Sequence, residues 1–110
     1  MKVSEIVETL GWRVLAGGAH LENEVSGGYV ADLLSCVMAG ADAENLWITL
    51  QTHANIVAVA SLLGISAIVV AENAPVPENT LDKAEEQGMP VLSTSEPVYE
   101  TVARLVDLGI

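Results

Sequence analysis

Four polar side chains interrupt an otherwise apolar run near the middle of the chain: Gln51, Thr52, His53 and Asn55. They follow a segment expected to be a strand and open one expected to be a helix. In open parallel sheets, ligands sit at the carboxyl ends of strands, and the free N–H groups of a helix start attract anions. The run therefore predicts either a ligand or partner site or a plain helix cap, in which Thr52 caps the helix and Asn55 bonds the turn.

Other chemistries lack the residue patterns that they need. His20, Cys36 and His53 could ligate a soft metal, but no two of them have the short spacing of a zinc motif. A catalytic triad could be assembled on paper from Ser35 or Cys36, a histidine and Asp32, but no nucleophile-elbow sequence is present, so no triad is expected. We expect no catalytic residue, no metal and no cofactor.

Two glycine pairs, at residues 17–18 and 27–28, are candidate phosphate loops. Neither forms G-x-G-x-x-G, and the chain contains no G-x-x-x-x-G-K-[ST]. Both pairs are therefore expected to be turns.

Composition limits the classes of partner. The chain has 110 residues with 4 basic and 15 acidic side chains, a net charge of -11, and a hydrophobic share of 51% without any Phe. Such a chain repels phosphate backbones and anionic lipid heads, which excludes nucleic-acid and membrane-surface binding. A single cysteine cannot form an internal disulfide, and no secretion signal opens the sequence, so we expect a cytoplasmic protein.

An uncharged stretch over residues 45–71 is long enough to cross a bilayer. It contains Gln, His and Asn side chains, which are costly in lipid, and no Lys or Arg flanks it. A buried strand, helix and strand explain the same run, so no membrane span is expected.

Hydrophobic spacing predicts alternating strands and helices along one domain covering residues 1–110. Strands are expected at residues 12–16, 29–31, 46–50, 67–71 and 90–93. Helices are expected from Ser4 to Gly11, at 54–63 and 78–87, and after Ser95, which would cap a last helix with apolar Val98, Val102, Leu105 and Val106. Residues 20–26 are expected to form a loop or short edge strand, and residues 32–41 remain ambiguous between a helix and turns.

This alternation predicts a single three-layer α/β domain. Its sheet is expected to be largely parallel, partly mixed on the side of the N-terminal half, and flanked by helices.

The string GYVADLLSCVMAGA at residues 28–41, followed by LWITLQTH at 46–53, resembles small stand-alone proteins of the DRTGG-domain family. GISAIVV at 64–70 and GMPVLST at 88–94 continue the resemblance, which runs from about residue 3 to the end of the chain. The sequence departs from the naming motif, because Gln51, Thr52, His53, Ala54 and Asn55 stand where the Asp-Arg-Thr-Gly-Gly pattern would follow the strand. The role of the charged pair of that motif therefore does not carry over.

The resemblance implies a fold similar to the N-terminal domains of HPr kinase/phosphorylase and of the Mur ligases, which serve assembly, regulation or substrate binding. It implies a non-catalytic regulatory module that binds a ligand or a protein partner. Two alternatives stay open: a structural subunit of a larger complex, of redox or hydrogenase type, and a small phosphate-handling enzyme. The missing P-loop argues against the enzyme.

Self-association is expected because a short chain rich in apolar residues cannot hide them all. A two-fold homodimer is the commonest closed assembly. Its interface is predicted within residues 27–41, with Tyr29, Leu33, Leu34 and Met38 as apolar contacts.

Overall fold

The computed structural model describes all 110 residues and contains one five-stranded sheet in the order β1-β5-β4-β3-β2. The strands are β1 (Arg13–Ala16), β2 (Gly27–Val30), β3 (Asn45–Thr49), β4 (Ala67–Val70) and β5 (Val91–Ser93). Strands β2 to β5 pair in parallel, and β1 joins the edge antiparallel to β5. The prediction of a largely parallel, partly mixed sheet is confirmed.

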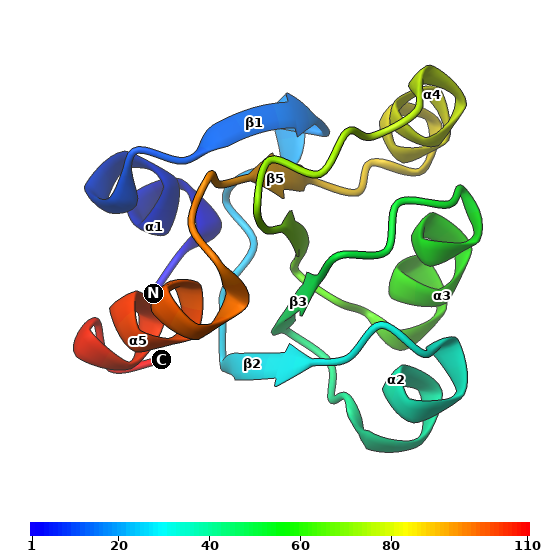
Figure 1. Cartoon of the computed structure of the whole chain (residues 1–110). Coiled ribbons are helices and arrows are strands. Elements are labelled where there is room, and N and C mark those ends of the chain that lie inside the picture. Colours follow the sequence, from blue (N-terminus) through cyan, green and yellow to red (C-terminus); the bar gives the residue numbers. More distant parts are fainter.

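Five helices cover both faces of the sheet, as Figure 1 shows. They are α1 (Val3–Leu10), α2 (Leu34–Gly40), α3 (Asn55–Leu63), α4 (Glu78–Gln87) and α5 (Val98–Asp107), with a 3₁₀ turn η1 (Gly18–His20) after β1. Helices α2, α3 and α4 pack on one face, and α1 and α5 pack on the other. The molecule is thus the three-layer α/β domain that the alternation predicted.

The central strands are apolar throughout because both of their faces are covered. In β3, Trp47 packs under α2 and α3, whereas its neighbours Leu46 and Ile48 point to the layer of α1 and α5. The same alternation separates Ile68 from Val69 in β4. Burial on both sides explains the long uncharged run, which divides into β3, α3 and β4. No helix of the structure has the length and hydrophobicity that a membrane crossing requires.

Several local predictions are wrong. Helix α1 begins at Val3 after Lys2, so Ser4 lies inside the helix and does not cap it; Glu5 accepts the Lys2 N–H instead (2.9 Å). Helix α5 begins at Val98 after Pro97, so Ser95 is not its cap either. On α5, Leu105 is buried as expected, but Val106 is 62% exposed and lines an open apolar groove beside Val30 of β2.

The structure settles two segments of the N-terminal half whose secondary structure the sequence left open. The region expected as a loop or edge strand becomes the η1 turn and a loop with one β-bridge between Glu24 and Lys2. Within residues 32–41, Leu34–Gly40 form helix α2, and its Val37 is buried. The pair Gly27 and Gly28 lies in β2, opposite Asn45 and Leu46, so the turn expected there is wrong.

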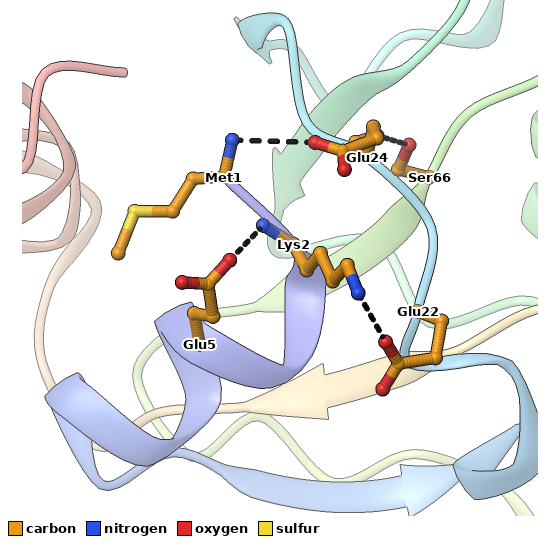
Figure 2. Close-up of polar contacts among 6 residues, drawn as sticks. All are labelled: Met1, Lys2, Glu5, Glu22, Glu24 and Ser66. Atoms are coloured by element: carbon orange, nitrogen blue, oxygen red, sulfur yellow. Dashed lines mark hydrogen bonds and ion pairs between the residues drawn. The ribbon is translucent and has the colours of Figure 1, made fainter.

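Polar contacts hold the loop after η1 against the start of α1 (Figure 2). The Lys2 Nζ donates to Glu22 Oε2 at 2.8 Å, which raises the pKa of the Lys2 ammonium through this hydrogen bond and the charge of Glu22. The Met1 ammonium lies 3.4 Å from Glu24 Oε2, and Ser66 Oγ donates to the Glu24 carbonyl. This end of the molecule is opposite the carboxyl ends of the parallel strands.

Candidate functional site

The carboxyl ends of four parallel strands meet at one edge of the sheet, which we call the carboxyl edge. Asp32 follows β2, residues 51–55 follow β3, Glu72 and Asn73 follow β4, and residues 94–96 follow β5. Because β1 is antiparallel, its first residue, Arg13, lies opposite Ser93 at the same edge. The edge is where open α/β sheets bind ligands.

The predicted site loop is held by its own side chains. Gln51 Oε1 accepts hydrogen bonds from the Thr52 N–H (3.1 Å) and the His53 N–H (3.3 Å). His53 Nδ1 accepts from the Asn55 N–H at 3.1 Å, and Thr49 Oγ1 accepts from the Gln51 N–H at 3.0 Å. The loop is therefore pre-formed, and its amide groups are already engaged.

The predicted capping role of Thr52 is wrong. The residue before α3 is Ala54, and no side chain caps the helix from that position. Thr52 contributes its carbonyl instead, which accepts from Thr80 Oγ1 at 2.8 Å and ties the loop to the start of α4. Gln51 and His53 supply the acceptors that the Thr52 hydroxyl was expected to provide.

Two of the four predicted site residues face solvent. His53 and Asn55 are exposed, whereas Gln51 and Thr52 are half-buried. Because His53 Nδ1 accepts a backbone N–H, the neutral imidazole carries its hydrogen on Nε2. The loop thus presents an imidazole N–H and a carboxamide, which together can bind a carbonyl, a carboxylate or a polar protein surface.

Asp32 belongs to this loop, although sequence reasoning considered it only as part of a catalytic triad. Its Oδ1 accepts from Thr49 Oγ1 and from the Leu50 N–H, both at 2.8 Å. The aspartate therefore positions the loop and is not paired with a nucleophile. Only its place directly after a short strand could have indicated this role.

A polar cavity of about 280 Å³ lies at the other half of the carboxyl edge. It is lined by Leu10, Gly11, Trp12, Arg13, Asn73, Ser93, Thr94, Ser95 and Glu96. Sequence reasoning missed this site, because its residues come from the end of α1, the start of β1 and the loops after β4 and β5. Isolated hydroxyl and amide residues carry no spacing that would have identified it.

Arg13 is the cation of this cavity. Its Nη2 donates to Asn73 Oδ1 at 3.1 Å and to Ser93 Oγ at 3.3 Å, both neutral acceptors, and it forms no ion pair. Glu96, the only carboxylate of the lining, pairs with Arg104, and the hydrogen bond and charge of Glu96 raise the pKa of the Arg104 guanidinium. The charge of Arg13 is thus not neutralised by the protein.

The loop after β4 takes an unusual backbone conformation at this cavity. Glu72 and Asn73 both have positive φ, 59° and 51°, a region that residues other than glycine seldom adopt. Their N–H groups donate to the carbonyls of Glu96 (3.0 Å) and Thr94 (2.9 Å), which lie in the loop after β5. The two loops are therefore tied together, and Asn73 is held where its side chain meets Arg13.

The first glycine pair is unsuited to holding phosphate. The Gly17 N–H donates to Glu85 Oε1 at 2.7 Å, so an acidic side chain occupies the position that an anion would take. Gly17 and Gly18 form the turn from β1 into η1, as expected. No group of three or more His, Cys, Asp or Glu side chains is arranged to hold a metal ion.

The predicted interface residues divide into two exposed and two half-buried side chains. Leu33 and Met38 are 64% and 53% exposed. Leu34 and Tyr29 pack against the core under α2, and the Tyr29 hydroxyl donates to the Cys36 carbonyl at 3.1 Å. Leu33 and Met38 therefore expose the most apolar surface of the four.

A three-layer α/β domain with a pre-formed loop and a polar cavity at its carboxyl edge is typical of small binding domains. The family model of the DRTGG domain matches residues 5–108, and the chain belongs to that family. A search of curated proteins found no match.

A solved structure shares the fold. It contains the CBS and DRTGG domains of the regulatory region of a Clostridium perfringens pyrophosphatase, complexed with the activator diadenosine tetraphosphate. The TM-score is 0.72 at 17% sequence identity, and the match covers 94% of this chain and 45% of that chain. The chain therefore spans less than half the length of that regulatory region.

Proposed function

We propose that the chain is a non-catalytic regulatory module that binds a ligand or a protein partner at the carboxyl edge of its sheet. Membership of the DRTGG-domain family and the likeness to a pyrophosphatase regulatory region support a regulatory role. The single cysteine, Cys36, is exposed and unpaired, which fits a reducing cytoplasm.

The observation that carries this proposal is the loop of residues 51–55. A phosphate-transferring loop leaves its backbone N–H groups free to hold phosphate oxygens. Here the N–H groups of Gln51, Thr52, His53 and Asn55 are bonded to side chains of the loop and of Thr49. The loop is therefore suited to presenting His53 and Asn55 to a ligand and not to cradling a nucleotide.

The net charge of this chain disfavours a ligand like diadenosine tetraphosphate, the activator in the pyrophosphatase structure. Four phosphates need several cations, whereas the carboxyl edge offers one unpaired arginine in a chain of net charge -11. We therefore expect a less charged ligand, or a protein partner, for this chain.

Native mass spectrometry of the protein purified from its own cell tests the proposed site. The His53→Ala and Asn55→Ala variants should fold and lose a bound mass that the unaltered chain retains. His20→Ala, which removes the other histidine, is the matched control. A bound protein at fixed stoichiometry would favour the structural subunit, and identical spectra for all variants would refute the site.

A phosphotransfer assay tests the absence of catalysis. Incubation with ATP, magnesium and a phosphocarrier protein should transfer no phosphate, because neither a P-loop nor a nucleophile–base pair is present. Stoichiometric turnover by clean protein would overturn the non-catalytic assignment.

We also propose that the chain forms a homodimer through α2 and the segment before it. Leu33 and Met38 are large apolar side chains exposed on neighbouring parts of this region. Their burial against a second copy would remove apolar surface from water, which offsets the repulsion between two acidic chains.

A further inference from the structure

We propose that the polar cavity around Arg13 is a binding site for a small ligand with one oxyanion headgroup, a carboxylate or a phosphate monoester. This assignment deepens the proposed function, on which it rests, by naming a ligand class for the half of the carboxyl edge away from His53. Three features of the cavity support it.

The first feature is the guanidinium itself. Arg13 Nη2 is fixed by Asn73 and Ser93, while Nε and Nη1 have no partner in the protein. An arginine oriented by neutral groups keeps its full charge and a planar set of free donors, which match the two oxygens of an oxyanion. Lys2 and Arg104 lack this freedom, because each forms an ion pair, with Glu22 and Glu96 respectively.

The second feature is an unpaired indole donor. Trp12 lines the cavity and is 6% exposed, and its Nε1–H has no hydrogen-bond acceptor. A buried donor without an acceptor costs free energy, so such groups normally find a partner. The other tryptophan conforms to this rule, because Trp47 Nε1 donates to the Ala31 carbonyl at 2.8 Å. The Nε1 atom is itself covered by protein, so an anion beside Arg13 becomes its acceptor only when the indole turns toward the cavity, a change that the indole resonance reports.

The third feature is the conformation of the loop that carries Asn73. Two successive residues with positive φ cost free energy and persist only where the surroundings hold them. Here they place the Asn73 carboxamide on the guanidinium, so the strain serves to orient Arg13 toward the cavity.

Size and charge define the ligand class. A volume of about 280 Å³ holds roughly nine water-sized groups. The hydroxyl residues Thr94 and Ser95 add neutral polar groups to the wall, and Glu96, although paired with Arg104, disfavours a second anionic group. The cavity is therefore suited to a single oxyanion headgroup on a small body, and not to a polyphosphate.

The two indole N–H groups allow a direct test by nuclear magnetic resonance. The ¹⁵N-labelled chain is titrated with acetate and, separately, with inorganic phosphate, at ionic strength held constant with chloride. The Trp12 indole resonance should shift with saturation in the millimolar range, and the Trp47 resonance should stay in place. If only acetate saturates the shift, the ligand class is a carboxylate, and if only phosphate does, it is a phosphate monoester. If both anions saturate the shift, the site accepts an oxyanion of either kind.

Variants decide whether Arg13 binds the anion. Arg13→Gln should lower the affinity for the anion that saturates the shift about tenfold or more, because a charge-assisted hydrogen bond is lost. Lys83→Gln removes the same charge from α4, where Lys83 forms no ion pair, and should change the affinity little. Arg13→Lys keeps the charge without the planar donors and should bind with intermediate affinity; an unchanged Trp47 resonance shows that each variant is folded.

The site is refuted if the Trp12 resonance does not move with either anion, or if Arg13→Gln and Lys83→Gln bind alike. Such a result would leave the proposed function standing, since that function is tested through His53 and Asn55. Loss of the His53 site would likewise leave the anion titration unaffected.

Discussion

Asp32 and Thr49 join the ends of two neighbouring parallel strands. The Thr49 hydroxyl is buried and donates to Asp32 Oδ1 at 2.8 Å, and the same oxygen accepts the Leu50 N–H. Thr49 Oγ1 in turn accepts the Gln51 N–H. A single carboxylate oxygen therefore fixes where the loop of residues 51–55 leaves the sheet.

Removal of that carboxylate should destabilise the chain. Asp32→Ala leaves the Thr49 hydroxyl buried without an acceptor, so the free energy of unfolding should fall by about 1–3 kcal/mol. Asp32→Asn keeps an oxygen acceptor and should lose less. Urea titration followed by circular dichroism measures both, with the exposed Asp42→Ala as a control; equal stability of all three variants would contradict the role of Asp32.

Gln51 should matter more to stability than Thr52. Gln51→Ala removes the acceptor of two loop N–H groups and should lower the free energy of unfolding by about 1 kcal/mol. Thr52→Ala leaves the carbonyl that binds Thr80 in place and should cost less. Thermal melts of the two variants compare them, and a larger loss for Thr52→Ala would restore the capping role predicted from the sequence.

The glycine pair after β1 provides a matched test of backbone conformation. Gly17 has φ of 72°, and a Cβ there would lie 2.5 Å from the Met89 carbonyl carbon. Gly17→Ala should therefore cost about 2 kcal/mol or more, since the left-handed conformation and the backbone contact both oppose the side chain.

The adjacent position should tolerate the same change. A Cβ on Gly18 would meet only Val14 Cγ1 at 3.9 Å, so Gly18→Ala should stay within about 0.5 kcal/mol of the parent. Denaturant midpoints measured side by side decide the matter. A tolerated Gly17→Ala would mean that β1 and the segment before β5 lie farther apart than the structure has them.

The homodimer should depend on α2. Leu33→Glu and Met38→Glu each place a charge in the proposed interface and should shift sedimentation at micromolar concentration from the dimer to a species of 11.5 kDa. Leu34→Glu is unsuitable because Leu34 packs against the core.

Leu62→Glu is the control, because Leu62 is 73% exposed on α3, outside the proposed interface. If the parent chain sediments as a monomer at every protein and salt concentration, the proposed dimer is refuted. A dimer that survives both α2 variants and dissociates with Leu62→Glu would place the interface on α3.

The sequence by itself determined the alternation of β3, α3, β4, α4, β5 and α5. Their hydrophobic periods are local, and glycines such as Gly64 and Gly88, both with positive φ, end the helices as predicted. The polar run at residues 51–55 was also recognisable from local sequence, since its polar side chains stand between an apolar strand and an apolar helix.

Tertiary structure decided the caps and the cavity. Ser4, Ser95 and Thr52 are all competent to cap, but Glu5, Gln51 and His53 supply the acceptors at α1 and at the loop before α3. Helix α5 begins at Val98, after Pro97, without a side-chain cap. Arg13 meets Asn73 and Ser93 across 60 and 80 residues of sequence. Only the order of the strands, with β1 antiparallel beside β5, brings these three side chains together, and no local pattern encodes that order.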